Sequence, residues 1–164
     1  MPRGRINGFT LLEAMMASAV LAFVVAAIAQ AVSVGHRETD VVLKRLRGTA
    51  LAEALMEEIV SKPYADPQGG TTPGPDLGES GRTGRDNIDD YNGFSESANS
   101  LADAQGVSYP SEWQSYTRTA TATYTTMSVA NLSQTPISGI AVTVTVTLTP
   151  GGSSWTLTRF IPAP

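Results

Sequence analysis

Residues 9–34 read FTLLEAMMASAVLAFVVAAIAQAVSV, and this stretch decides the fold of the N-terminal part of the chain. Its side chains are overwhelmingly apolar, and about 20 such residues are enough for an α-helix to cross the hydrocarbon core of a bilayer. Glu13 carries the one charge in the run. Because a charge within hydrocarbon costs roughly 2.5 to 3.5 kcal/mol on insertion scales, this carboxylate is a candidate functional residue. We therefore predict a transmembrane helix over residues 9–34.

The residues that flank this helix indicate its orientation. Arg3 and Arg5 precede it, so the positive-inside bias places the N-terminus in the cytoplasm and the rest of the chain on the other side. Basic residues at 37, 44, 45 and 47 weaken that bias. A secretory signal peptide cleaved near Ala29 or Ala31 is an alternative, but its apolar region is about 7 to 15 residues long and it leaves Glu13 unexplained.

Residues 8–14, GFTLLEA, resemble the processing site of type IV pilins and of the pseudopilins of type II secretion. The resemblance implies that residues 1–8 are a leader and that a prepilin peptidase cuts between Gly8 and Phe9 on the cytoplasmic side. It also implies that the same enzyme N-methylates Phe9. Glu13 would then be the fifth residue of the mature chain, where the family has its glutamate.

Cleavage after Gly8 would give Glu13 a partner. The cut creates a positive amine at Phe9, and a buried carboxylate needs a nearby positive charge or hydrogen-bond donors. Glu13 lies four residues after Phe9, so the partner is the amine of its own helix or the amine of a neighbouring subunit. The resemblance favours the second, in which the pair sets the register of a growing filament. The alternative is that Glu13 only extends to the cytoplasmic headgroups.

Residues 35–62 are predicted to continue the same helix as an amphipathic stem. They are rich in good helix formers, and the chain has no proline between Pro2 and Pro63. Pro63 should end the helix near residue 61 or 62, and residues 9–62 would then span on the order of 80 Å. Gly35 and Gly48 are candidate bends. An apolar face expected to pack on a sheet consists of Leu43, Leu46, Ala50, Leu51, Ala54, Leu55 and Ile59.

Residues 63–112 are predicted to form a loop region with an acidic turn, because proline and glycine are frequent up to residue 84. The turn at residues 86–94 crowds carboxylates before a glycine, and we expect Tyr91 and Phe94 to pack on the stem or sheet. An EF-hand loop starting at Asp86 would need an oxygen ligand at its third position, where Ile88 stands. Residues 89–93 also resemble a stretch of minor pilins of the mannose-sensitive haemagglutinin type. We expect no metal, with one alternative: a calcium site of another kind built from Asp86, Asp89, Asp90 and Asn92.

Residues 113–164 are predicted to form an antiparallel sheet. Apolar residues at 140, 142, 144, 146 and 148 alternate with alanine and threonines, the pattern of a half-buried strand. Residues 150–154 are turn residues and 155–161 read as the returning strand. Residues 113–127 also alternate, with threonine at every second position from 117 to 125. At least three strands are expected, and the stem must cover their apolar face because a small sheet is marginal alone.

Composition limits the function. The chain of 164 residues has no cysteine and a formal net charge of −4 at pH 7, which excludes thiol chemistry and argues against nucleic acid as a partner. His36 is the only histidine and lies just beyond the apolar run. Asp89 and Glu96 are a candidate carboxylate pair for acid and base catalysis, but acidic pairs in a turn are usually solvated. We predict no enzymatic activity and no cofactor.

The fold class predicted is α+β and pilin-like: a long N-terminal helix, half transmembrane and half amphipathic, packed on a C-terminal antiparallel sheet. The predicted function is that of a minor pilin or pseudopilin in a type IV pilus-like filament or a type II secretion pseudopilus. The resemblance implies other pilin or pseudopilin subunits, prepilin peptidase, the inner-membrane assembly platform and membrane lipid as partners. It places the chain in the bacterial inner membrane, with an extracytoplasmic C-terminal domain, before filament entry. The alternative is a membrane-anchored binding module that does not polymerise.

Overall fold

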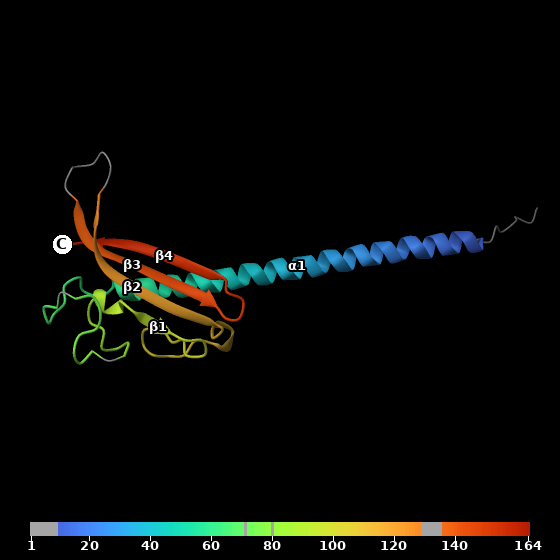
Figure 1. The fold of residues 1–164 in the computed structure, drawn as a ribbon. Helices are drawn as coiled ribbons and strands as arrows, with labels where there is room; N and C mark the ends of the chain where they lie inside the picture. Colours follow the sequence, from blue (N-terminus) through green and yellow to red (C-terminus); the bar gives the residue numbers. More distant parts are fainter. Residues whose placement is uncertain (1–9, 71, 80, 129–135) are drawn as a thin grey trace, which may run out of the picture. The chain divides into compact units, whose positions relative to one another are not determined.

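The computed structural model describes residues 10–70, 72–79, 81–128 and 136–164. One long helix is followed in the sequence by a four-stranded sheet, and one short 3-10 helix precedes each of the first two strands (Figure 1). The chain divides into two compact units, Met1–Leu43 and Lys44–Pro164.

Helix α1 runs from Leu11 to Val60. Its last turn is closed by the amide of Ser61, which donates to the Glu57 carbonyl over 3.0 Å, and Pro63 then prevents further helix. The predicted end of the stem is therefore confirmed to within two residues. The helix continues through Gly35 and Gly48, so neither glycine terminates it.

The part of α1 that belongs to the first unit buries none of its apolar side chains within the chain. Every described residue from 10 to 43 is exposed, and Phe23 keeps 79% of its surface accessible. This helix contains a stretch that is long and apolar enough to cross a membrane. The prediction of a long N-terminal apolar helix is confirmed.

The second unit contains an antiparallel sheet in the strand order β1-β2-β3-β4. Its strands are β1 (Phe94–Glu96), β2 (Tyr116–Met127), β3 (Ile137–Leu148) and β4 (Ser154–Pro162). The register places Ala120 opposite Val144 and Val144 opposite Leu157. The three predicted strands are confirmed. Strand β1 is an addition, since it lies with the 3-10 helix η1 (Asp89–Tyr91) in the region expected to be loop; η2 (Ser111–Trp113) precedes β2.

The core lies between the sheet and residues 48–59 of α1 (Figure 1). On β3 the valines at 142, 144 and 146 are fully buried against the helix. The threonines between them face the other way and form hydroxyl contacts across β3 and β4, at 3.2 Å for Thr143 with Thr158 and for Thr145 with Thr156. Valine and threonine both favour strands, and the two-residue period sends them to opposite faces.

The buried face of α1 differs from the predicted one. Leu51, Leu55 and Ile59 are buried as expected, but Leu43, Leu46, Ala50 and Ala54 are exposed. Each residue advances an α-helix by about 100°, so these four side chains lie roughly 100° to 180° around the helix from Leu55. The predicted face combined residues from two apolar stripes of the helix, and the sheet covers only one of them. The covered stripe consists of Gly48, Leu51, Ala52, Leu55, Met56 and Ile59.

Gly48 is the point at which the helix lies in close contact with Trp155. A Cβ built on it would overlap the six-membered ring of Trp155 on β4. The missing side chain therefore lets the indole lie directly against the helix backbone. Trp155 in turn packs against Tyr116, with ring centroids 6.0 Å apart.

Candidate functional site

The start of α1 is built as a capping box. Thr10 precedes the helix, and its backbone amide and its hydroxyl both donate to Glu13 Oε2, over 2.8 and 2.9 Å. In return the Glu13 amide donates to Thr10 Oγ1 over 3.3 Å. This reciprocal arrangement satisfies amide groups that the first turn of a helix leaves without carbonyl partners.

The capping box gives Glu13 a partner within its own chain. Both Thr10 groups donate to Glu13 Oε2, and no residue in the described part of the chain donates a hydrogen bond to Glu13 Oε1. The carboxylate is exposed on the isolated chain, so it is accessible to a further donor. Gly8 and Phe9 lie outside the described residues, and the predicted cleavage and methylation site therefore stays a prediction.

A network of buried ion pairs ties the loop region to the helix and the sheet. Arg82 donates to Glu58 Oε1 over 2.8 Å and to Glu96 Oε1 over 2.8 Å. Glu96 Oε2 accepts from Arg118 Nε over 2.7 Å, and Arg118 is fully buried. Both arginines also donate to the carbonyl of Ala102, over 2.7 and 2.6 Å.

Sequence reasoning missed this network because its four charged side chains are far apart along the chain. Burial opposes ionisation of Glu58, but hydrogen bonds from Arg82 and from the Tyr91 hydroxyl outweigh it and lower the pKa of this carboxyl. The only sequence signal available was Arg118, a charged residue at an inward position of an alternating strand. A buried arginine of this kind requires carboxylate partners.

Tyr91 and Phe94 pack in the core as predicted. Tyr91 is fully buried, and its hydroxyl donates to Glu58 Oε1 over 2.8 Å. The guanidinium of Arg85 lies 5.4 Å from the centroid of Tyr91 and 5.2 Å from that of Phe94. These rings therefore hold the acidic turn against the helix.

The acidic turn brings together only some of the predicted calcium ligands. Oxygen atoms of Asp86 and Asp90 lie within 4.8 Å of each other and of Glu79, which the sequence had not suggested. Asp89 instead accepts from the Tyr124 hydroxyl over 3.2 Å, and Asn92 donates to the Pro73 carbonyl over 3.5 Å. The four predicted residues thus do not form one oxygen cluster.

Asp89 and Glu96 do not share a partner that would make them a catalytic pair. Glu96 is held by the two arginines of the buried network. Asp89 is buried beside Tyr124, and this burial raises the pKa of the Asp89 carboxyl. Burial together with the charge of Asp89 raises the pKa of Tyr124 to about 12. His36 is exposed on α1.

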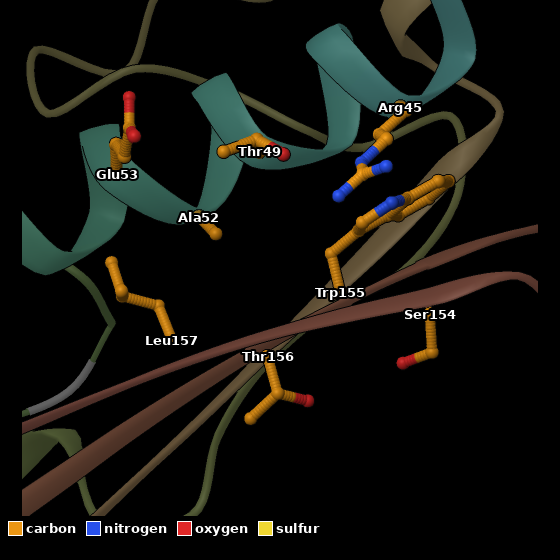
Figure 2. A pocket seen from close by; sticks show the side chains of 8 residues that line it. All are labelled: Arg45, Thr49, Ala52, Glu53, Ser154, Trp155, Thr156 and Leu157. Atoms are coloured by element: carbon orange, nitrogen blue, oxygen red, sulfur yellow. The ribbon is translucent and has the colours of Figure 1, made fainter. Parts of the chain in front are cut away.

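A pocket of about 350 Å³ lies in the second unit between α1 and β4 (Figure 2). Figure 2 shows Trp155 and Leu157 pointing from the strand toward the helix, with the Arg45 side chain beside the indole. The lining combines a guanidinium, a carboxylate, hydroxyls and apolar groups, so it suits a small polar ligand with an apolar part. The lining residues are Arg45, Thr49, Ala52, Glu53, Ser154, Trp155, Thr156 and Leu157.

Comparison with known proteins gives a family match at the N-terminus. Residues 3–29 match the family model described as the prokaryotic N-terminal methylation motif. No curated protein and no solved structure matches the chain. The motif and the long apolar helix together fit an inner-membrane anchored protein with a soluble C-terminal domain. The chain thus carries the prokaryotic N-terminal methylation motif, the signal of type IV pilin-like precursors.

Proposed function

We propose that this protein is a minor pilin or pseudopilin that is incorporated in a type IV pilus-like filament or in a type II secretion pseudopilus. The observation that carries the proposal is the match of residues 3–29 to the N-terminal methylation motif. In this account residues 1–8 are removed, Phe9 becomes the methylated N-terminus, and residues 9–34 anchor the chain in the inner membrane. The role is structural and not catalytic.

The exposed apolar surface of α1 supports assembly. Residues 11–43 bury no side chain within the chain, and Leu46 keeps 61% of its surface accessible on the opposite side from the packed stripe. Lipid can cover such a surface in the membrane. Outside the membrane the same surface needs other helices, because large exposed apolar areas are rare on soluble proteins.

Glu13 acts in this proposal as the residue that aligns neighbouring subunits. Before cleavage its Oε2 is held by Thr10, and Oε1 remains accessible. After cleavage the Phe9 amine of a neighbouring subunit adds a positive charge to the same carboxylate. This contact is an ion pair as well as a hydrogen bond, whereas the two Thr10 donors carry no charge.

Mass spectrometry of the chain recovered from membranes tests the processing step. The expected N-terminal peptide begins at Phe9 and carries one added methyl group. A Gly8→Val variant should keep the leader, whereas a Gly35→Val variant, altered at a glycine within α1, should be processed normally. An intact leader on the parent chain, or a mature end near residue 30, contradicts the proposal.

A membrane-anchored binding module that does not polymerise is the second candidate, and the pocket beside Trp155 favours it. Cysteine crosslinking between helices of neighbouring subunits separates the two functions. Cysteines placed at exposed positions 42 and 46 should crosslink in sheared filaments if the chain assembles. Exclusive recovery of uncrosslinked chain in membranes, under conditions in which filaments form, favours the binding module.

A further inference from the structure

Strand β4 forms one edge of the sheet. Among the described residues β3 is the one strand that pairs with it. The Ser153 carbonyl and the Ala163 amide, at the two ends of β4, both bond to residues of β3 over 2.9 Å. The odd-numbered residues of β4 therefore direct their backbone groups toward β3. The amides and carbonyls of the even-numbered residues from 154 to 160 point the other way and are open to a further strand.

This edge lacks most of the features by which proteins prevent unwanted strand pairing. Its register with β3 continues without interruption over nine residues, so it contains no bulge, and it carries no lysine. Pro162 removes one amide at its far end. Thr156 and Thr158, at its middle, are exposed. The edge is thus long and regular enough to accept an added strand.

The pocket of about 350 Å³ borders the same strand. Helix α1 contributes Arg45, Thr49 and Glu53 to it, and all three side chains are exposed. Ala52 and Leu157 supply apolar surface. Alternate side chains of a strand turn to the same face, so every second side chain of an added strand would face this pocket. When a peptide extends a sheet, main-chain bonds give affinity and pockets of this kind select the side chains.

Two charges of opposite sign lie at the ends of the pocket. Figure 2 shows Arg45 beside Trp155 and Glu53 at the other end. In the described part of the chain neither Arg45 nor Glu53 forms an ion pair or a side-chain hydrogen bond. Arg159, the cation of β4, lies 3.8 Å from Glu57. A ligand therefore meets an unpaired positive charge at one end and an unpaired negative charge at the other.

The spacing of these charges matches an extended peptide. Arg45 and Glu53 are eight positions apart in α1, which is about 12 Å along a helix. Positions i and i+4 of a strand share a face and are about 13 Å apart. Position i+2 then lies over Ala52 and Leu157, which favour an apolar side chain. Helix α1 and β4 run in the same direction past the pocket (Figure 2), so a strand antiparallel to β4 meets Glu53 first and Arg45 last.

We propose that the edge of β4 and the pocket beside it bind an extended segment of another protein. The segment adds antiparallel to β4 and carries a basic, an apolar and an acidic side chain at alternate positions, read from its N-terminal end. The basic side chain lies by Glu53 and the acidic one by Arg45. The intervening residues lie opposite Thr156 and Thr158, where hydroxyl side chains would extend the rows that join β3 and β4.

A second copy of this chain does not offer such a segment. The sequence contains the pattern once, as Lys62, Tyr64 and Asp66. Tyr64 packs against the core, and Lys62 donates to the Arg85 carbonyl over 2.7 Å. These side chains are engaged in the fold of their own chain, so the proposed occupant is a different protein.

Fluorescence titration of the full chain in phosphatidylcholine nanodiscs tests the proposal. A Trp113→Phe background leaves Trp155 as the one tryptophan, and the probe is the capped peptide TKTVTET. This peptide should give a saturable change in emission. The reversed peptide TETVTKT has the same composition but places like charges together at both ends, so it should bind about threefold to thirtyfold more weakly.

Two further changes separate charge recognition from strand addition. TKTVTET that is N-methylated at the threonines on either side of valine lacks amides that would bond to β4, so it should bind at least about tenfold more weakly. Arg45→Glu combined with Glu53→Lys should reverse the preference between the two peptides. Both residues are exposed and unpaired, so the double variant should fold. Arg37→Glu, on α1 outside the second unit, is the control and should leave the preference unchanged.

The outcomes that overturn the proposal are distinct. Absence of saturable binding at millimolar TKTVTET overturns it outright. Equal binding of the N-methylated peptide overturns strand addition, and equal binding of TETVTKT or an unchanged preference in the double variant overturns charge recognition. Self-association of the chain that TKTVTET blocks assigns the edge to a second copy. The result is independent of the proposed assembly, because processing and helix crosslinking report on α1 and not on β4.

Discussion

The two halves of α1 belong to one continuous helix but have different partners. From residue 11 to residue 34 every side chain except Glu13 is uncharged and most are apolar, and no residue up to 43 is covered by the chain itself. From residue 48 to residue 59 one stripe is buried under the sheet and the opposite side is exposed. The difference teaches that the apolar residues of α1 stabilise the second unit only where the sheet covers them. The first half has to be covered from outside the chain, by lipid or by other helices.

The largest effect is expected from truncating the packed stripe. Leu55 is fully buried, so Leu55→Ala should lower the free energy of unfolding by about 2 to 5 kcal/mol through lost burial and a residual cavity. Val24→Ala, in the uncovered half, should change it by less than about 0.5 kcal/mol. Urea unfolding of the full chain in detergent, followed by tryptophan fluorescence, measures both. Equal losses in the two variants would show that both halves contribute to one cooperative core.

The next largest effect is expected from the carboxylate that joins α1 to the buried network. Glu58→Gln weakens charge-assisted bonds with Arg82, so the free energy of unfolding should fall by about 1.5 to 3 kcal/mol. Glu57→Gln is the control: Glu57 is 77% exposed and lies 3.8 Å from Arg159, a surface pair worth about 0 to 1 kcal/mol.

The same carboxylate predicts a dependence of stability on pH. The pKa of Glu58 is lowered in the folded chain, so its contribution is present above the ordinary carboxyl pKa. That contribution is lost as the pH falls through the lowered value. The difference in unfolding free energy between the parent and Glu58→Gln should therefore shrink in acid. A difference that stays constant from neutral pH down to about pH 3 would refute the ionic role of Glu58.

Two glycines of the same helix provide a matched pair. A methyl group at Gly48 meets the Trp155 ring, so Gly48→Ala should destabilise the second unit by about 1 to 3 kcal/mol. Gly35 has open space around it, and Gly35→Ala should stabilise the helix by up to about 1 kcal/mol. Thermal unfolding monitored by circular dichroism reads both changes. Stabilisation by Gly48→Ala would mean that the indole does not contact the helix backbone.

The smallest change in unfolding is expected from Glu13, although its effect on assembly should be large. Glu13→Ala removes an exposed carboxylate whose hydrogen bonds within the described residues come from Thr10, so the urea midpoint of the second unit should not move. Processing and membrane insertion should continue, whereas incorporation into filaments should be lost. Quantitative blotting of sheared filaments against membranes measures this, with Glu38→Ala as the control on the same helix. Normal incorporation of the Glu13→Ala variant into filaments would contradict the proposed role of Glu13 in assembly.

The elements with a strong local pattern were predictable from sequence. The helix ends where Pro63 requires, and β3 follows the alternation of valine and threonine that begins at Ile140. The predicted packed face of α1 was partly wrong, because an apolar pattern on a helix does not say which of two stripes the sheet will cover. Strand β1 was missed because three residues between turns carry too little pattern.

Some residues of the candidate sites could also be predicted from sequence, and others could not. Glu13 stands out in sequence because it is a charge in an apolar run, and Thr10 three residues before it matches a capping box. Glu79 and the network of Glu58, Arg82 and Glu96 did not stand out. Their partners are brought together only when the loop folds back on the helix and sheet.

The sequence by itself determined the apolar helix, its methylation motif, its C-terminal end and the antiparallel strands, because each depends on neighbouring residues and on a local period. The tertiary structure alone decided which stripe of α1 is covered, why Gly48 must lack a side chain, and which charges are paired. These features depend on contacts between residues distant in the chain.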